Sequence, residues 1–373
     1  MKIGMLGGGQ LGRMLILAGY PLGFSFRVFD ERFSESAGAV APQSVGRYDD
    51  IDALREFADG LDVITYEWEN VPVAAATFLS SLCPVYPPPL ALEQSQDRLT
   101  EKRFFHRVGI PTAPFVAVET RDDLDAAVQQ TGLPAVLKTR RLGYDGKGQV
   151  VIQTPADVET AWATLGGSPL LLEGFVAFER EVSILAVRSR SGQMWCYPLV
   201  ENAHADGMLR CSQAPAPHIT PALQQQAESY AQRVGDALQY VGVLAIEFFY
   251  VVAQGSQTST TLIANEMAPR VHNSGHWTIE GAETSQFANH IRAIAGLPLG
   301  STRPVGYSTM LNCIGTMPDR SAILAVPGSH VHDYGKSARA GRKLGHVTVR
   351  GDDRTAVANA VESIEYLFKK TNP

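Results

Sequence analysis

The first quarter of the chain shows two alternating patterns of apolar and polar positions: short apolar runs and segments with helical spacing. Three apolar runs have the length and composition of buried parallel strands: 2–6, 26–30 and 61–66. The glycine-rich turn at 7–12 follows the first run and opens a segment whose apolar side chains recur at helical spacing. Strands that alternate with helices predict an α/β domain, which we expect to end at the proline-rich stretch 85–89.

Strand patterns dominate the next hundred residues. A helical segment at 97–106 is stopped by Gly109 and Pro111. Short apolar runs then predict a small lobe built around a sheet, at about 115–185: 134–138, 149–152, 170–173 and 182–187.

A long helix and a long hairpin follow. Thr220 can cap a helix that has Pro221 at its first position, and Gly242 ends it. Two apolar runs, 243–252 and 260–267, are joined by a polar turn and predict the hairpin. Short strands, a basic cluster and a closing helix make up the remainder of the chain.

Composition limits the possible functions. A chain of 373 residues is long enough for two or three domains with cores of their own. Because 45% of its residues are hydrophobic and its net charge is −6, it is neither a disordered chain nor a general binder of nucleic acid. Any anionic ligand must therefore be bound by local clusters of charge.

No segment predicts a membrane span or export. The longest uncharged stretch, 70–92, contains five prolines and cannot form an apolar spanning helix. The N-terminus lacks a basic region followed by an apolar helix and a cleavage site. The four cysteines have neither metal-binding nor catalytic spacing. We therefore expect a cytoplasmic protein with reduced, buried thiols and no membrane partner.

Two acids in the hairpin are the strongest chemical signal. If the turn is centred between Ser256 and Gln257, Glu247 and Glu266 face each other across the strands. Like charges this close repel, and their apolar neighbours increase the repulsion. Three outcomes are open: a divalent cation between the carboxylates, one carboxylate held protonated, or a register slip that separates them. Oxygen ligands without zinc-type spacing favour Mg²⁺ or Mn²⁺ in the first case.

Two glycine-rich loops indicate phosphate binding. The turn at 7–12, with Asp30 at the end of the next strand, has the order of a dinucleotide-binding fold. The loop 143–149 lies between two predicted strands, and its glycines would let backbone N–H groups approach phosphate oxygens. Lys138 and Lys147 would supply positive charge to that loop. It is not a Walker A loop, and a simple hairpin turn is the alternative.

Three further clusters could line a site. The apolar bend 170–176 could offer backbone groups to a purine, and Glu181 could bind ribose hydroxyls, although a solvated strand charge is the alternative for Glu181. Residues 265–276 concentrate an acid, amides, an arginine and two histidines, which favours an active-site wall over a buried structural network. The basic cluster at 336–343 is either a solvated face or an anion site.

Together these motifs resemble one family. The likeness is carried by GGGQLGRM (7–14), DRLTEK (97–102), GYDGKGQ (143–149), NAHADGMLR (202–210) and NEMAPRVHNSGHWT (265–278). In this order they resemble the N5-carboxyaminoimidazole ribonucleotide synthases of the ATP-grasp superfamily. The resemblance implies an ATP-grasp fold, in class α/β and α+β, with three domains: a Rossmann-like preATP-grasp domain (1–96), the ATP-grasp domain (97–300) and a small C-terminal domain (301–373).

The resemblance also implies roles for single residues. Ribonucleotide binding falls to Gly8, Gly9, Gln10, Leu11, Glu69, Arg339 and Lys343. ATP binding falls to Arg98, Lys138, Gly143, Tyr144, Asp145, Gly146, Lys147, Gly148, Gln149, Glu173, Gly174, Phe175, Val176, Glu181, His204, Asn265 and Glu266. Mg²⁺ would be held by Glu247 and Glu266. The reacting groups would be surrounded by Tyr144, Asp145, Arg270, His272, Asn273, Lys336 and Arg342.

The implied reaction is the ATP-dependent carboxylation of 5-aminoimidazole ribonucleotide by bicarbonate. Bicarbonate attacks the γ-phosphorus of ATP and gives carboxyphosphate and ADP. The carboxyl group then passes, directly or as CO₂, to the exocyclic amine of the ribonucleotide, and phosphate is released. The resemblance also implies a homodimer.

Three other functions compete with this one. An NAD-dependent oxidoreductase would use the turn at 7–12 and Asp30 but leaves the acid pair and the second glycine loop unexplained. Another ATP-grasp ligase, similar to formate-dependent glycinamide ribonucleotide transformylase or to biotin carboxylase, would share the metal and ATP residues. A regulator without catalysis would be expected to lack an acid of the pair or Lys138, yet all three are present.

Overall fold

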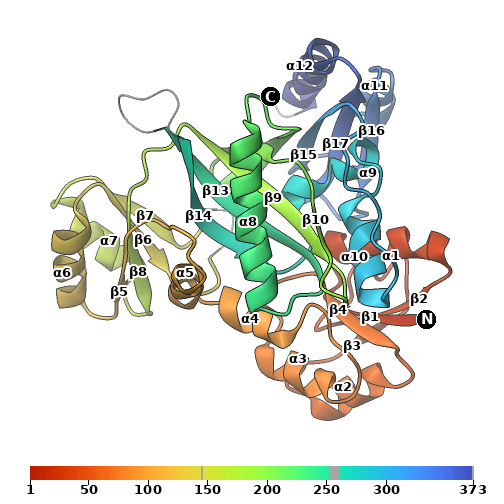
Figure 1. Ribbon diagram of the computed structural model, residues 1–373, viewed down its shortest axis with the longest axis horizontal. Coiled ribbons are helices and arrows are strands. Elements are labelled where there is room, and N and C mark those ends of the chain that lie inside the picture. The colour runs from red at the N-terminus through yellow and green to blue at the C-terminus, as the bar shows by residue number, and fades with distance from the viewer. Residues whose placement is uncertain (144–145, 253–259, 372–373) are drawn as a thin grey trace.

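The computed structural model describes residues 1–143, 146–252 and 260–371 (Figure 1). The first of its sheets is parallel, with the order β3-β2-β1-β4: β1 (Lys2–Leu6), β2 (Ser25–Asp30), β3 (Gln43–Val45) and β4 (Val63–Tyr66). The helices beside it are α1 (Gln10–Gly19), the 3₁₀ turn η1 (Tyr20–Leu22), α2 (Ile51–Ala58), α3 (Val73–Ser80) and α4 (Pro89–Ser95). The three strands predicted from apolar runs are confirmed.

Both faces of this sheet are buried, which explains why β1 is an unbroken apolar run. Ile3 and Met5 point to one face and belong to a core that continues into the central sheet of the protein. Leu6 points to the other face and packs with Phe29 and Ile64 in a separate core. The sheet is thus fixed against the rest of the molecule, and the glycine turn that follows β1 is fixed with it.

A small lobe projects from the molecule beyond helix α5 (Arg98–Arg107) (Figure 1). Its antiparallel sheet has the order β5-β8-β6-β7: β5 (Phe115–Val118), β6 (Ala135–Thr139), β7 (Gln149–Ile152) and β8 (Leu170–Gly174). Helices α6 (Arg121–Thr131) and α7 (Asp157–Leu165) cover it and complete a core of its own. The expected limit near residue 185 lies inside a strand of the central sheet, so the sheet of the lobe ends earlier, at Gly174.

The central sheet has nine strands, in the order β14-β13-β9-β11-β12-β15-β17-β16, and β10 pairs with β9. Their bounds are β9 (Arg180–Arg188), β10 (Met194–Cys196), β11 (Val200–Ala205), β12 (Met208–Ala214), β13 (Gly242–Val252), β14 (Thr260–Ala268), β15 (Tyr307–Ile314), β16 (Ser329–Asp333) and β17 (Lys343–Gly351). The C-terminal strands extend the same sheet, because β15 pairs with β12.

Helices cover this sheet on both sides. They are α8 (Pro221–Ala237), the 3₁₀ turn η2 (Asn273–Gly275), α9 (Thr278–Gly281), α10 (Gln286–Ala295), α11 (Arg320–Leu324) and α12 (Arg354–Thr371). The predicted helix from Thr220 is confirmed, because the Thr220 side chain accepts a hydrogen bond from the backbone N–H of Leu223 and caps α8. Among the described helices, none has both the length and the apolar composition needed to cross a membrane.

The β13–β14 hairpin pairs Glu247 with Glu266, but not by the register that the sequence predicted. From Phe248 onward, each residue of β13 pairs with a β14 residue one position earlier than predicted; Phe248, for example, pairs with Ala264. The predicted centre of the turn lies outside the described residues. A β-bulge at Asn265 restores the expected alignment at the two acids. Because the bulge interrupts the alternation of side chains, Asn265 and Glu266 can face the same side although they are consecutive.

Candidate active site

A cavity of about 440 Å³ opens between the small lobe, the central sheet and the glycine turn after β1. Most residues predicted to bind ATP line it: Arg98, Lys138, Gly143, Gly146, Lys147, Gln149, Glu173, Gly174, Phe175, Val176, Glu181, His204, Asn265 and Glu266. Predicted metal, substrate and catalytic residues share it: Gln10, Leu11, Glu69, Glu247, Arg270, His272, Asn273 and Lys343. The fold thus gathers motifs from almost the whole sequence around one space.

Other predicted residues are not part of the cavity lining. Within the described part of the chain, these are Gly8, Gly9, Gly148, Lys336, Arg339 and Arg342. Tyr144 and Asp145 lie outside the described residues. The wall also contains residues that the sequence analysis missed: Val136, Val151, Phe178, Gly207, Leu209 and Phe249. Phe249 follows Glu247 by two positions on β13, so strand alternation could have placed it on the same face.

The rings of Phe178 and Phe249 form an apolar part of the wall. Their centroids are 4.7 Å apart and their planes differ by 16°, so the rings are stacked. Phe175, at the predicted purine-binding bend, is 48% exposed. Such a surface suits a planar, weakly polar ligand face.

Glu173 binds two lysines. Lys138 Nζ lies 2.9 Å and Lys102 Nζ 3.4 Å from Glu173 Oε2, and all three side chains are nearly buried. Burial alone would raise the pKa of Glu173, but the two lysines outweigh it and lower this pKa to about 2. The carboxylate is therefore ionised and fixes Lys138 at the cavity. The bend at 174–176, which follows Glu173, lines the cavity and could offer its backbone groups to a ligand.

Helix α5 binds the bulged part of β14 through three residues on one helical face. The contacts are Arg98 NH1 to Glu266 Oε2 at 3.0 Å, the backbone N–H of Met267 to Glu101 Oε1 at 2.7 Å, and Lys102 Nζ to the carbonyl oxygen of Asn265 at 2.7 Å. Burial and the nearby Glu266 raise the pKa of Glu101 to about 8. The helix thereby holds the strand in the conformation that presents Asn265 and Glu266 to the cavity.

The predicted acid pair exists, and its two members have different surroundings. Burial, reinforced by Glu266, raises the pKa of Glu247 to about 8. Burial also acts on Glu266, but Arg98 outweighs it and keeps the pKa of Glu266 below its usual value. Because the strands pair Glu247 with Glu266, a register slip that separates the two acids is excluded. A cation and a proton remain as ways to relieve the repulsion at Glu247.

The donor atoms at this point fit a hard cation. Glu247 and Glu266 offer carboxylate oxygens, and the side-chain oxygen of Asn265 is buried with no hydrogen-bond partner among the described residues. Oxygen donors of this kind are those that Mg²⁺ and Mn²⁺ prefer.

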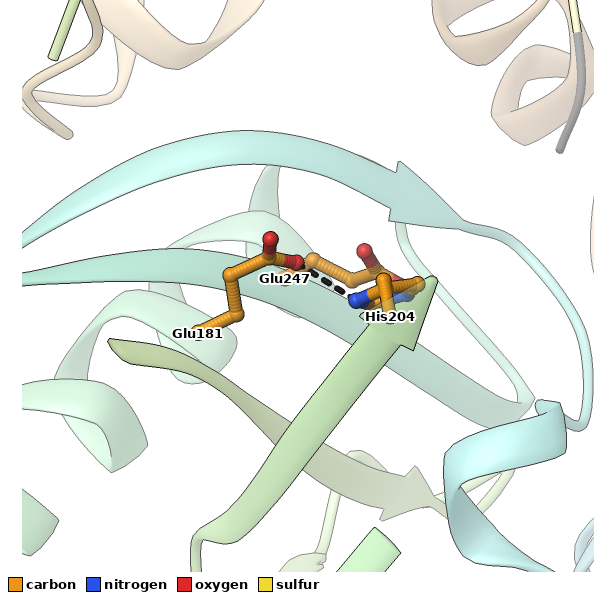
Figure 2. Close-up of side chains that lie close together, drawn as sticks. All are labelled: Glu181, His204 and Glu247. Atoms are coloured by element: carbon orange, nitrogen blue, oxygen red, sulfur yellow. Dashed lines mark ion pairs between the residues drawn. The ribbon is translucent and has the colours of Figure 1, made fainter. Parts of the chain in front are cut away.

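A second group of possible ligands overlaps with the first. Figure 2 shows Glu181, His204 and Glu247 converging from three strands, and their candidate ligand atoms all lie within 4.8 Å of one another. His204 Nδ1 is 2.8 Å from Glu181 Oε2. Although burial opposes it, Glu181 raises the pKa of His204 and so favours the charged imidazole. An imidazole in the set suits borderline metals better than Mg²⁺.

The chain's own carboxylates engage the first glycine turn. Asp30 Oδ2 accepts the N–H of Gly8 at 2.7 Å. The two oxygens of Glu67 accept the N–H groups of Gly9 and Gly12. A Cβ atom on Gly9 would lie 2.3 Å from Glu67 Oε1, so only glycine allows this approach. Glu67 was not predicted from the sequence, because a single acid after a strand carries no motif.

The basic cluster divides into two parts. Lys336 Nζ donates to the Gln10 side chain beside the glycine turn, and burial lowers the pKa of Lys336 to about 8. Lys343 lines the cavity. Arg342 instead donates to Ser337 in its own loop, and Arg339 is exposed, so the structure does not bring these two to the cavity wall.

Two of the remaining predicted residues are tied to their neighbours. Arg270 Nε donates to Glu69, and both line the cavity. Asn273 exchanges side-chain amide hydrogen bonds of 3.1 and 2.9 Å with Asn312 on β15. Its amide thus joins the wall of the cavity to the C-terminal strands.

Comparison with known proteins identifies the relatives of this chain. Family models match in three segments: the ribonucleotide synthetase preATP-grasp domain at 1–96, the ATP-grasp domain at 103–287 and the phosphoribosylaminoimidazole carboxylase C-terminal domain at 308–360. N5-carboxyaminoimidazole ribonucleotide synthase of Pseudomonas aeruginosa is 52% identical over 99% of this chain and 100% of its own length. The chain belongs to the N5-carboxyaminoimidazole ribonucleotide synthase family.

Solved structures of the family have the same fold. The N5-carboxyaminoimidazole ribonucleotide synthetase of Thermus thermophilus matches with a TM-score of 0.92 and 55% identity over 98% of each chain. The Aspergillus clavatus N5-carboxyaminoimidazole synthase, in complex with ADP and 5-aminoimidazole ribonucleotide, matches with a TM-score of 0.91 and 30% identity over 99% of this chain and 98% of its own. The family resemblance and the ATP-grasp fold expected from the motifs are confirmed.

Proposed function

We propose that this chain carboxylates 5-aminoimidazole ribonucleotide to N5-carboxyaminoimidazole ribonucleotide, using ATP and bicarbonate and releasing ADP and phosphate. The observation that carries the proposal is the single cavity shared by a lysine-rich nucleotide wall, an acid pair and the first glycine turn. Family membership favours this reaction over the other ATP-grasp ligases. The expected division into 1–96, 97–300 and 301–373 belongs to the same proposal.

ATP would lie along the small lobe. The stacked Phe178 and Phe249, with the backbone at 174–176, would receive the purine. Lys138 would meet the phosphates, because Glu173 already fixes its position. Arg98 would neutralise phosphate charge from the opposite wall. A fixed cation stabilises the charge that develops during phosphoryl transfer more effectively than a mobile one.

Mg²⁺ would be held by Glu247 and Glu266, with Asn265 beside them. When bound, it would neutralise charge on the ATP phosphates and orient them. The set with His204 is the weaker candidate for Mg²⁺, because Glu181 already pairs with the imidazole. Within this proposal, Glu181 and His204 therefore bind the nucleoside part of ATP.

Bicarbonate and the ribonucleotide would occupy the side of Arg270. Arg270, oriented by Glu69, would face the carboxyphosphate formed from bicarbonate and the γ-phosphoryl group. Gln10 and Leu11, at the start of α1, together with Lys336 and Lys343 would bind the phosphate of the ribonucleotide. The cavity would hold the amine close to carboxyphosphate and away from water. The proposal also includes a homodimer, which the family resemblance implies, and a cytoplasmic location, which the sequence pattern favours.

An assay of ADP release against a panel of acceptors tests the proposal. Release should reach its full rate only with bicarbonate, Mg²⁺ and 5-aminoimidazole ribonucleotide together. Glycinamide ribonucleotide and biotin should give no comparable stimulation, and equal stimulation by either would overturn the assignment. Chromatographic detection of the carboxylated ribonucleotide separates the proposed synthesis from an ATPase side reaction.

The metal assignment has a test of its own. Glu266→Gln should remove most turnover and leave the fold intact, because the pair then carries one charge for the cation instead of two. Near-normal activity would mean that the cation is held elsewhere. Glu283→Gln, at an exposed ion pair with Arg303, is a matched control that should retain activity.

A further inference from the structure

A chain of buried hydrogen bonds runs beneath the cavity and ends at His272, whose ring lies beside Glu247. Its contacts are Ser212 Oγ to Asn202 Oδ1 at 2.8 Å, Asn202 Nδ2 to Ser183 Oγ at 2.9 Å, Ser183 Oγ to Ser274 Oγ at 2.8 Å, and Ser274 Oγ to His272 Nδ1 at 2.9 Å. The other ring nitrogen, His272 Nε2, is 3.2 Å from Glu247 Oε1. We name the five residues from Ser212 to His272 the serine relay.

The serine relay crosses neighbouring strands of the central sheet. Ser212 on β12 and Asn202 on β11 are cross-strand partners, and so are Ser183 on β9 and Glu247 on β13. The three serines are completely buried, and Asn202 is 6% exposed. Buried polar groups are costly unless every one of them is paired, so their hydrogen bonds must be mutually consistent.

The direction of the hydrogen bond between His272 and Ser274 depends on which ring nitrogen carries the proton. Each serine hydroxyl has one proton to donate, and a neutral imidazole has one N–H. If His272 carried its proton on Nδ1, it would donate to Ser274, whereas the bonds of Asn202 would keep their direction, because its Nδ2–H only donates and its Oδ1 only accepts. If the proton were on Nε2, every hydroxyl would donate toward the histidine.

The contacts of the His272 ring select the tautomer with the proton on Nε2. The backbone N–H of Ser274 donates to His272 Nδ1 at 3.3 Å, so Nδ1 is an acceptor and carries no proton. The proton of the neutral ring is then on Nε2, which lies beside Glu247 Oε1. Ser274 therefore donates to Nδ1, Ser183 donates to Ser274, and the Asn202 amide N–H donates to Ser183.

We propose that the serine relay holds His272 as the neutral Nε2–H tautomer, which donates to Glu247 and fixes the orientation of that carboxylate. His272 is then a positioning residue: Nδ1 already accepts from Ser274, and Nε2 is a donor, so neither nitrogen is free to take a proton from a substrate. The inference that an oriented Glu247 helps to bind a cation rests on the proposed function. The inference about the tautomer of His272 does not. Groups that orient a metal ligand in this way commonly change metal affinity by about 10-fold to 100-fold when they are removed.

NMR of protein labelled with ¹⁵N at histidine tests the tautomer directly. The chain has nine histidines, and a His272→Gln variant identifies the signals of His272 by difference. At neutral pH, Nδ1 of His272 should resonate as an unprotonated nitrogen, and Nε2 as a protonated one. A protonated Nδ1 in the wild-type protein would overturn the proposal without bearing on the reaction.

Variants of the relay test its effect on the cation site. Ser274→Ala and Ser183→Ala should weaken the binding of Mn²⁺ together with ADP by about 10-fold, measured by electron paramagnetic resonance without ribonucleotide. Ser274→Ala should also produce mixed tautomer signals at His272. Ser308→Ala is the matched control, because this buried serine on β15 has a hydroxyl without a hydrogen-bond partner among the described residues.

The NMR spectrum of His272 and the binding of Mn²⁺ together distinguish an effect of the serine relay from a general loss of stability. Loss of Mn²⁺ binding with an unchanged His272 spectrum in both relay variants would overturn the proposed coupling. So would an equal loss of binding in Ser308→Ala. The acceptor assay remains independent, since a chain with the predicted tautomer could still fail to carboxylate the ribonucleotide.

Discussion

The two glycine-rich loops at the cavity have similar composition but use glycine for different reasons. In the turn after β1, Gly9 is required because the Glu67 carboxylate approaches its backbone, and a Cβ atom would lie 2.3 Å from Oε1. In the loop between β6 and β7, Gly148 has a φ of +73°, where other residues are strained. The first turn is largely buried, whereas Gly146, Lys147 and Gln149 are exposed.

This difference determines how each loop can meet an anion. The chain's own carboxylates occupy the N–H groups of Gly8 and Gly9, so charge for a ligand at the first turn must come from nearby lysines. The second loop lies beside the buried Lys138 and contains Lys147. A glycine pattern therefore indicates close approach of the backbone, but the approaching group can belong to the protein itself.

The largest effect on activity is expected from Lys138, which lies on β6 beside the second loop. Lys138→Met should lower kcat by about 100-fold or more, because a fixed cation is lost where phosphate charge develops. The fold should persist, since Glu173 keeps Lys102 as a partner. Steady-state ADP release measures the loss. Lys147→Met, at an exposed position of the same loop, is the comparison, and an equal loss there would contradict the special role of the buried lysine.

A smaller effect is expected at the first turn. Glu67→Gln places an amide NH₂ against one of two backbone N–H groups, so one hydrogen bond is lost and two donors face each other. We expect the free energy of unfolding to fall by about 1–3 kcal/mol. KM for the ribonucleotide should rise by about tenfold, while KM for ATP stays unchanged. Urea unfolding and separate titrations of each substrate measure these effects.

Exposed Glu56 provides the control for this substitution, and Glu56→Gln should change neither quantity. If Glu67→Gln raised KM for ATP and for the ribonucleotide alike, the two loops would not act on separate substrates. The contrast between them would then lose its functional meaning.

Local patterns allowed much of the fold to be predicted, but not the pairing of distant segments. The apolar run at β1 and the cap at Thr220 are local features, and both were correct. The Glu247–Glu266 pair was also correct, although its assumed register was not, because a one-residue bulge leaves no mark in a short pattern. The pairing of β12 with β15 depends on packing far along the chain and could not be inferred.

The candidate site divides in the same way. Residues within motifs, such as Gln149 and Arg270, line the cavity. Glu67, Lys102 and Ser183 act through contacts with residues far away in sequence, and none of them was proposed. Sequence patterns mark groups that meet a ligand, whereas groups that hold them need the tertiary structure.

A pH dependence should distinguish Lys336, which lies beside the first turn, from the lysines of the ATP site. Burial lowers the pKa of Lys336 to about 8, so its charge is lost as the pH rises through that value. KM for the anionic ribonucleotide should therefore rise by about threefold between pH 7.5 and 8.5. KM for ATP should not follow. In Lys336→Arg, whose guanidinium keeps its charge, the rise should disappear, and its persistence would assign the effect to another group.

The same shift has a predictable sign for stability. A lysine with a lowered pKa in the folded state destabilises the protein while it is charged, below pH 8. This cost disappears as the pH rises from about 8 toward the ordinary lysine value of 10.5. Lys336→Met should therefore increase stability at pH 7 and have less effect at pH 10, as thermal unfolding at the two pH values would show.

The smallest expected effect concerns Gly148 in the second loop, where both a close neighbour and a positive φ favour glycine. A Cβ atom on Gly148 would lie 2.5 Å from Thr139 Oγ1, and its positive φ adds strain of about 1–2 kcal/mol. Thr139→Ala removes the collision but not the strain. In a double-mutant cycle, Gly148→Ala should therefore cost about 1 kcal/mol less in the Thr139→Ala background than in the wild type. If the changes in unfolding free energy of the two substitutions were additive, backbone conformation alone would require glycine at position 148. The contrast to Gly9, which is required because a carboxylate approaches it, would then be sharper.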